Sequence, residues 1–427
     1  MPSEDVSEFG GWPRPPRWVW AVAGVAAVAV LAGVVVARTG PHHAAVSSPS
    51  RSPATAASPV PGSRTPAGSA ARWPSAAGAC GTPVDLPQIH LARRHAHVHA
   101  RVLVGGTGLR RVTLGGAVSG PLPGLPEHGW LVTSLVAGPG AAYAFDVPCF
   151  SSSASVRVYR IVAGAAHRLG VTADALLGGP HHAWAVTYLP RAVVTQVLTP
   201  RGRAVAVRSH TDPVADTAAG LVVVAYHPPA GRRHTVELVD PNTGAVLRRL
   251  GEGFPMGAAG HVLLVSLHGC AAPPAHGTCT LESVNLNTGR PATPVELPAG
   301  RVPVWGDVPS PVFSPDGTLA AFQLARARPD PRFAAAAPGP PSDVAVLHLR
   351  TGRLDIVPGL ELPPRTWAGL AFDATGRWLL ATVSEGDRGE LLAWRPGMPG
   401  PALVTSLPGP LAEAPPLLPA TTWWRTG

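Results

Sequence analysis

Short apolar runs recur along the chain from about Cys80 onward, and each run follows a turn residue. The runs are rich in Val, Leu, Ala and aromatic side chains, which is the composition of half-buried and buried β-strands. They are AAYAFDV at 141–147, AWAVTYL at 183–189, LVVVAYH at 221–227, HVLLVSL at 261–267, TLAAFQL at 318–324 and RWLLATV at 377–383. This pattern predicts an all-β fold for residues 80–427.

A second signal follows each run: a strand, a turn that contains glycine, and another strand. Glycine supplies the positive φ that tight hairpin turns need. The expected turn glycines are Gly108, Gly164, Gly202, Gly244, Gly289, Gly352 and Gly397. The copy at Gly108 has the pattern of the same hairpin with a shorter lead-in.

The interval between these glycines averages about 48 residues, close to the roughly 40–50 residues of a four-stranded propeller blade. An all-β repeat of this period predicts a β-propeller of about seven four-stranded blades, with six or eight left open. The stretch after Gly397, which ends in LLPATTWW, is the candidate for the strand that completes the first blade and closes the ring.

Two of the turns carry a family resemblance. The segment FSPDGTLAAF at 313–322 resembles the repeat of TolB-like and WD40-like propellers, and FDATGRWLLAT at 372–382 is a looser copy. The turn residues are Asp316 with Gly317 and Asp373 with Gly376, where a short acid can bond its own backbone. The resemblance, to a membrane-anchored bacterial type, implies a propeller with a binding or scaffold role, and it carries over no catalytic residues.

The N-terminal region has a different pattern. Residues 18–37, WVWAVAGVAAVAVLAGVVVA, form an uncharged apolar stretch long enough for a helix that spans a hydrocarbon core of about 30 Å. Trp18 and Trp20 lie where indole rings favour the membrane interface. We expect an uncleaved signal anchor, with residues 1–17 as a short cytoplasmic tail. The alternative is a signal peptide cleaved near Ala37, which would release a secreted form.

Residues 38–79 are rich in Pro, Ala, Ser and Thr and poor in large apolar residues. Such a segment buries too little surface to offset its ordering entropy. We therefore expect a disordered linker that holds an extracytoplasmic domain, residues 80–427, away from the membrane. Either fate of the N-terminal segment places that domain outside the cytoplasm.

Four cysteines, Cys80, Cys149, Cys270 and Cys279, form no C-x-x-C pair. An even, sparse count in an exported chain favours two disulfides. We prefer the pairs Cys270–Cys279 and Cys80–Cys149, because the first pair closes a short loop that contains Pro273, Pro274 and Gly277. The other pairings, and four buried free thiols, remain alternatives.

The sequence excludes several kinds of chemistry. All 34 Lys and Arg residues are Arg, so P-loop, Schiff-base and kinase mechanisms that need a lysine are excluded. No G-x-S-x-G, H-E-x-x-H or EF-hand pattern occurs. We therefore predict a protein that is not an enzyme and needs no cofactor, with an enzyme whose site lies in the central channel as the alternative.

One cluster of possible metal ligands stands out. His95, His97 and His99 alternate in HLARRHAHVHA, so on a strand they share one face and could bind a metal ion. No carboxylate lies nearby in sequence, and the polar face of an exposed edge strand explains the pattern more simply.

The formal net charge is +9. A basic extracytoplasmic domain suits an anionic cell-envelope polymer, although scattered solvated charges explain the value equally. Nucleic acid is not an expected partner, because no interleaving of basic and aromatic residues occurs. We therefore predict a membrane-anchored module that binds a protein or a ligand.

Overall fold

The protein is described from a computed structural model. The residues that the structure describes are 101–106, 108–113, 116–126, 130–148, 156–189, 192–198, 204–209, 211–226, 234–268, 270, 278–304, 311–326, 341–363, 368–385, 388–407 and 417–419. The predicted tail, anchor and linker at 1–79 lie outside these residues. No described residue belongs to an apolar helix of membrane-spanning length.

The described residues form β-sheets in which consecutive strands pair antiparallel, and they contain no helix. Blade 1 contains β3 (Trp130–Gly138), β4 (Ala141–Pro148), β5 (Arg157–Val162) and β6 (Ala165–Leu169). Blade 2 contains β7 (Ala175–Gly178), β8 (Ala183–Leu189), β9 (Ala192–Leu198) and β10 (Ala204–Ser209). Blade 3 contains β11 (Thr211–Thr217), β12 (Gly220–Tyr226), β13 (His234–Val239) and β14 (Val246–Glu252).

The next blades repeat this order. Blade 4 contains β15 (Phe254–Ala259), β16 (Val262–His268), β17 (Thr280–Asn285) and β18 (Val295–Glu296). Blade 5 contains β19 (Arg301–Pro303) and β20 (Val312–Phe313), which both pair with β21 (Leu319–Arg326), and then β22 (Ser342–His348) and β23 (Leu354–Leu362). Blade 6 contains β24 (Gly369–Phe372), β25 (Leu379–Glu385), β26 (Arg388–Trp394) and β27 (Ala402–Leu407).

Blade 7 joins the two ends of the described chain. The C-terminal strand β28 (Leu417–Pro419) pairs with β1 (Val102–Val104), and β1 pairs with β2 (Arg110–Val112). A bridge from Val112 to Val118 extends this sheet. The expectation that the segment after Gly397 closes the ring is therefore confirmed.

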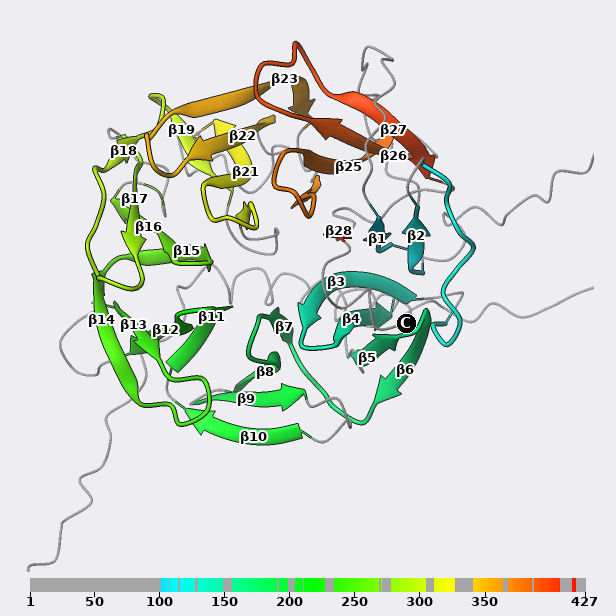
Figure 1. Cartoon of the computed structure of the whole chain (residues 1–427), viewed down its shortest axis with the longest axis horizontal. Coiled ribbons are helices and arrows are strands. Elements are labelled where there is room, and N and C mark those ends of the chain that lie inside the picture. The colour runs from blue at the N-terminus through cyan, green and yellow to red at the C-terminus, as the bar shows by residue number, and fades with distance from the viewer. Residues whose placement is uncertain are drawn as a thin grey trace, which may run out of the picture. The chain divides into compact units, whose positions relative to one another are not determined.

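The seven blades form a closed ring (Figure 1). The innermost strands contact one another in the order β28, β3, β7, β11, β15, β20, β24 and back to β28. This arrangement confirms the predicted seven-bladed, all-β propeller.

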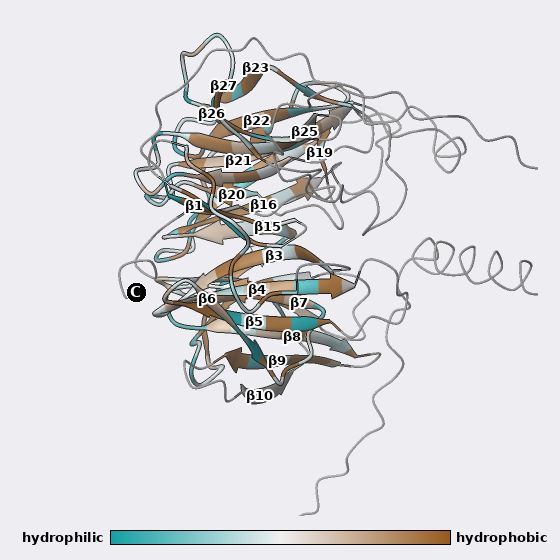
Figure 2. Cartoon of the chain, turned by 90° about the vertical axis from the view of Figure 1, so that its right-hand side faces the viewer, coloured by the Kyte–Doolittle hydropathy of each residue, from teal (hydrophilic) through white to brown (hydrophobic). Residues whose placement is uncertain are grey.

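The hydrophobic core lies between neighbouring blades, so each sheet buries both of its faces. Leu264, Phe322 and Leu347 pack between blades 4 and 5, and Val346 and Phe372 pack between blades 5 and 6. Figure 2 shows the apolar colour along the strands and the hydrophilic colour mainly at the turns. Burial on both faces explains why the strands read as nearly continuous apolar runs.

The six predicted runs coincide with β4, β8, β12, β16, β21 and β25, the second strands of blades 1–6. Of the expected turn glycines, Gly164, Gly244, Gly289, Gly352 and Gly397 lie between third and fourth strands with positive φ. Gly108 differs, because it lies between β1 and β2, the second and third strands of blade 7. Gly202 lies outside the described residues.

Candidate functional site

Strand alternation gives the ring two ends with different contents. Within each blade the strands are numbered outward from the innermost one. One end of the ring carries the turns between first and second strands and between third and fourth strands, and we call it the turn end. The first and third strands begin at the opposite end, which we call the start end. The residues at the two ends have different environments.

Several predicted site residues lie outside the described part of the chain: His95, His97, His99, Cys80 and Cys149. Within the described ranges, no group of three or more His, Cys, Asp or Glu side chains is placed to hold a metal ion. The predicted histidine site therefore stays a prediction.

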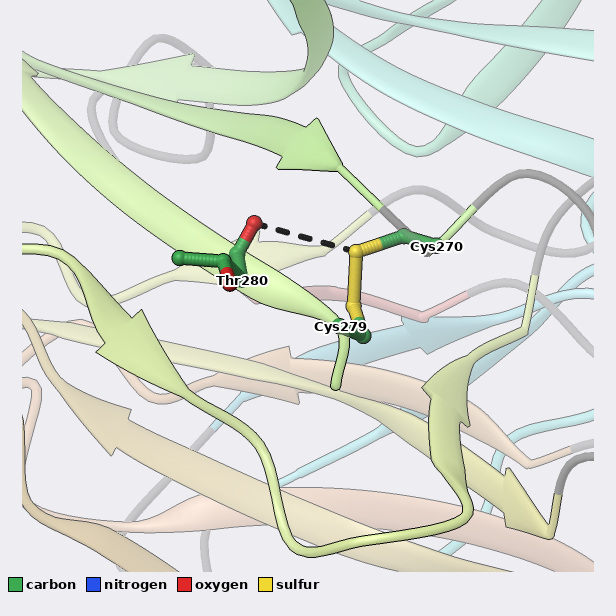
Figure 3. The surroundings of a disulfide bond; sticks show 3 residues. All are labelled: Cys270, Cys279 and Thr280. Atoms are coloured by element: carbon green, nitrogen blue, oxygen red, sulfur yellow. Dashed lines mark hydrogen bonds between the residues drawn. A yellow bond between two sulfur atoms is a disulfide. The ribbon is translucent and has the colours of Figure 1, made fainter. Parts of the chain in front are cut away.

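The predicted pair Cys270–Cys279 forms a disulfide, with Cα atoms 4.7 Å apart (Figure 3). Cys279 directly precedes β17, and Cys270 lies just beyond the end of β16, so the bond ties the second and third strands of blade 4 together at the start end. The Sγ of Cys270 lies 3.7 Å from the carbonyl oxygen of Thr280, a contact without a proton because a disulfide sulfur carries none. Both cysteines are buried in the core between blades 4 and 5.

The acids of the family-like turns serve the turns themselves. Asp316 accepts hydrogen bonds from the backbone N–H and the hydroxyl of Thr318. Asp373 accepts bonds from the N–H of Trp378 and the hydroxyl of Thr375. Desolvation acts to raise the pKa of Asp316, but the bonds from Ser314 and Thr318 outweigh it and lower that pKa. Both carboxylates therefore shape the hairpins and point back into them.

A buried acid also links blades 2 and 3 at the turn end. The carboxylate of Asp216 accepts hydrogen bonds from His181 Nδ1 at 2.8 Å and from the backbone N–H of His182 at 2.7 Å. The indole Nε1 of Trp184 lies 3.4 Å from the same carboxylate. The Asp216 side chain is fully buried, and a Cβ added at Gly179 would come within 2.3 Å of the Cβ of Asp216. The group is a tightly packed clamp between two blades.

The start end of blade 1 holds a second buried acid with fewer partners. Asp146, near the end of β4, is 1% exposed and pairs across the sheet with Arg157, the first residue of β5. The Asp146 Oδ2 and the Arg157 Nε are both buried and have no hydrogen-bond partner. The Arg157 guanidinium instead stacks on the ring of Trp130, with Cζ 3.4 Å from the ring centroid.

Burial dominates the electrostatics of Asp146. Desolvation raises its pKa from 3.8 to about 7, although the positive charge of Arg157 acts in the opposite direction. Trp130 and Arg157 are only partly buried. The three side chains, which we call the Asp146 cluster, therefore place a carboxyl group that titrates near neutral pH close to the surface of the start end.

Asp146 occupies a position that recurs around the ring. In four blades a glycine lies in the turn before the second strand, and the residue six places after it is polar and buried. These residues are Asp146, Ser266, Gln323 and Thr382. The Oε1 and Nε2 atoms of Gln323 also lack a hydrogen-bond partner. Buried polar groups are normally satisfied, so orphaned ones point to water or a ligand. Asp146 is the ionisable member of this set.

The innermost strands are irregular beside these positions. Bulges interrupt the pairing in β3 between Val132 and Ser134, in β11 between Pro213 and Ala215, and in β15 between Pro255 and Gly257. In blade 5 the innermost strand is divided into β19 and β20 at the corresponding place. Bulges bend a strand and release its pairing, and they are common beside functional sites.

A polar contact continues along the start end into blades 2 and 3. Asp174 accepts a hydrogen bond from the N–H of Tyr188 at 2.7 Å. The Tyr188 hydroxyl in turn donates to Asp212 at 3.2 Å, across the boundary between the two blades. Tyr188 and Phe254 are each about half exposed. The start end thus combines carboxylates with accessible aromatic rings.

A fixed spacing in the sequence marks these buried polar positions. The turn glycines Gly140, Gly260, Gly317 and Gly376 each precede the buried polar position by six residues. A polar residue inside each apolar run marks this position. The partners of each residue follow only from the pairing of the strands.

No protein-family model matches the chain, and no curated protein matches it in sequence. Solved structures share its fold. The periplasmic gluconolactonase PpgL of Pseudomonas aeruginosa is 13% identical over 75% of this chain and 99% of that protein, with a TM-score of 0.45. TolB from Acinetobacter baumannii is 14% identical over 75% of this chain and 68% of that protein, with a TM-score of 0.39.

A chain of the mitotic checkpoint complex is 14% identical over 78% of this chain and 99% of its own length, with a TM-score of 0.43. At such identities the similarity concerns the fold alone. The expected resemblance to TolB-like and WD40-like propellers is confirmed at that level.

The prediction that the chain is not an enzyme is wrong as an inference from the sequence. Solved structures that resemble the chain include a gluconolactonase. The prediction relied on missing linear motifs, and a propeller can assemble a site from residues on several strands that share no motif. The Asp146 cluster brings side chains of three strands together, and no search for linear motifs would detect it.

Proposed function

We propose that the chain is a membrane-anchored extracytoplasmic propeller that binds a small polar ligand at the start end of blade 1. The observation that carries this proposal is the Asp146 cluster: a buried carboxylate oxygen and a buried guanidinium N–H, both without a partner, beside a partly exposed indole. An unsatisfied buried polar group costs about 1–3 kcal/mol. A ligand that satisfies both groups would recover that cost.

The two orphaned atoms define the ligand's chemistry. The Asp146 Oδ2 accepts a hydrogen bond when ionised, and the Arg157 Nε donates one. A hydroxycarboxylate supplies both complements, with its hydroxyl donating to Asp146 and its carboxylate accepting from Arg157. Trp130, on whose ring the guanidinium stacks, holds Arg157 beside Asp146. We therefore propose a hydroxycarboxylate as the ligand class.

A second candidate function is acid–base catalysis on the bound ligand. The pKa of Asp146, raised by burial to about 7, gives the carboxyl group comparable protonated and ionised populations near neutral pH. Such a group can both take and give a proton. Perturbed carboxyl groups of this kind are enriched at active sites.

Ligand-detected NMR on the full-length chain in detergent tests the binding proposal. The probes are gluconate, tartrate and lactate, with sorbitol and acetate as analogues that lack the carboxylate or the hydroxyl. We expect at least one hydroxycarboxylate to bind, and its affinity to fall at least tenfold in Asp146→Asn and in Arg157→Gln. The proposal would be refuted if sorbitol and acetate gave the same signals as the hydroxycarboxylates. It would also be refuted if both variants bound the hydroxycarboxylate as tightly as the wild type does.

The same samples test catalysis. Hydrolysis of the lactone of a bound hydroxycarboxylate, in which water adds to the carbonyl carbon and the ring oxygen leaves as the hydroxyl, is followed by NMR. Its rate should depend on pH with a midpoint near 7 and should disappear in Asp146→Asn. If the chain binds the ligand but forms no product, catalysis is refuted and only the binding function remains.

The placement of the chain has its own test. The apolar segment 18–37 and the Pro-rich linker 38–79 support a single-pass topology with the N-terminus in the cytoplasm. Protease added to intact cells should then remove the propeller while sparing the N-terminal tail. Full protection of the propeller would contradict the proposed topology, and recovery of a chain that begins after Ala37 would indicate the cleaved, secreted form.

A further inference from the structure

The turn end of blades 4, 5 and 6 carries an arc of arginines. Their turns lie between β17 and β18, between β22 and β23, between β24 and β25, and between β26 and β27. The arginine arc consists of Arg290, Arg350, Arg353, Arg377 and Arg395, all exposed.

The turns of the arc belong to blades that touch one another. The Ser283 hydroxyl of blade 4 donates to the carbonyl of Leu349 at the start of the blade 5 turn. A Cβ added at Gly376 of blade 6 would lie 3.3 Å from Pro315 of blade 5. The turns that carry the arginines therefore follow one another across three touching blades.

Three acids, Asp316, Asp355 and Asp373, lie in the same region, so the five arginines outnumber them by two. Asp316 and Asp373 are engaged by hydrogen bonds within their own turns. Asp355 pairs with Arg353 and with His348. Among the described residues, no carboxylate forms an ion pair with Arg290, Arg350, Arg377 or Arg395. Arg395 instead lies over the ring of Trp378, with Cζ 5.1 Å from its centroid, next to Arg377.

We infer that the arginine arc is a docking surface for a linear phosphate polymer. Guanidinium groups bind phosphate in a forked, bidentate geometry, and a row of them spread over three blades matches a repeating anion. A lipid bilayer fits less well, because the exposed large apolar side chains nearest these turns, Val246, Leu247 and Ile356, lie on strands β14 and β23 and not among the arginines of the turns. This surface lies at the opposite end of the ring from the Asp146 cluster, and its ligand is independent of the one proposed there.

The test uses the full-length chain in detergent and fluorescently labelled long-chain inorganic polyphosphate, with binding followed by fluorescence polarisation. Each lost phosphate contact should lower the slope of log affinity against log salt by roughly 0.7–0.9. We expect Arg377→Gln to weaken binding about three- to fivefold with that loss of slope. Replacing Arg290, Arg350, Arg377 and Arg395 together with Gln should abolish binding.

The matched control is Arg168→Gln, which removes one exposed arginine from β6 of blade 1. It changes the net charge equally and should leave affinity and slope nearly unchanged. Equal weakening by Arg168→Gln and Arg377→Gln would overturn the docking surface, since net charge alone would then explain binding. Failure of the wild-type chain to bind polyphosphate would overturn it as well.

Competition identifies the source of the phosphate. Unlabelled polyphosphate should displace the probe, whereas orthophosphate and phosphatidylcholine vesicles should not. Displacement by phosphatidylglycerol vesicles at equal phosphate concentration would assign the surface to lipid instead and refute the polymer. A correctly folded quadruple variant, verified by an unchanged thermal unfolding midpoint, is required for each comparison.

Discussion

Asp146 shows how one residue can set a pH dependence for the whole domain. The unfolded chain releases the Asp146 proton near 3.8, whereas the folded chain holds it to about 7. The folded state therefore binds more protons across this window, and its stability falls as the pH rises through it. Below both values, this residue contributes no pH dependence.

We predict that Asp146→Asn removes this dependence. At pH 8 the variant should be more stable than the wild type by up to about 4 kcal/mol, the equivalent of a three-unit pKa shift. Near pH 4 the two should be similar. Urea unfolding at both pH values measures the difference. A wild-type chain that gains stability, relative to the variant, between pH 5 and pH 8 would contradict the assigned burial of the carboxyl group.

Asp316→Asn is the matched control, because the pKa of Asp316 is shifted in the opposite direction from that of Asp146. The hydrogen bonds of its turn lower the pKa of Asp316, so its contribution is present above the unfolded value and is lost as the pH falls through the folded one. The variant should be less stable than the wild type at neutral pH, and the difference should shrink in acid.

The clamp at Asp216 gives a prediction of a different kind. Asp216→Ala leaves the N–H of His182 and the Nδ1 of His181 without their acceptor at the boundary of blades 2 and 3. We expect a loss of about 2–4 kcal/mol in the free energy of unfolding, measured by urea denaturation. Asn242→Ala, which removes only an exposed bond to His182, should cost less than 1 kcal/mol. Equal effects would show that the clamp does not join the blades.

At the scale of elements, the second strands could be predicted from the sequence, because both of their faces are buried and both of their edges are paired. The innermost strands could not. Some are as short as β20 and β24, and bulges break the alternation of β3, β11 and β15. The site was missed for the same reason, since Trp130, Asp146 and Arg157 lie on three strands whose register only the sheet defines.

The disulfide of blade 4 closes a loop with a sequence separation of 9 residues. A loop of this size restricts the unfolded chain by about 2–3 kcal/mol. The Cys270→Ser/Cys279→Ser variant should lose that amount relative to the wild type when both are unfolded in urea without reductant. In reductant the two proteins should have equal free energies of unfolding, and a difference that persists there would show that the substitutions act through something other than this bond.

At the scale of the whole molecule, the ring depends on a short contact between distant parts of the chain. Leu418 of β28 lies opposite Leu103 of β1 and packs against the core that blades 7 and 1 share. Leu418→Asp should bring a charge to this boundary and cost about 2–4 kcal/mol. Thermal unfolding measures the loss, and the protease sensitivity of β1 and β2 is a second measurement. Leu418→Val, which keeps an apolar side chain at this position, is the control and should lose less stability.

The pairing of β28 with β1 also has a consequence for how the protein reaches its native state. Among the strands that the structure describes, β1 is synthesised first and β28 last, so the edge of β1 that pairs with β28 stays unpaired until the end of synthesis. Exposed strand edges invite pairing with other chains. The period between synthesis of β1 and arrival of β28 is thus when the chain is most prone to aggregate. A circular permutant that begins at β3 and joins β28 directly to β1 should shorten it.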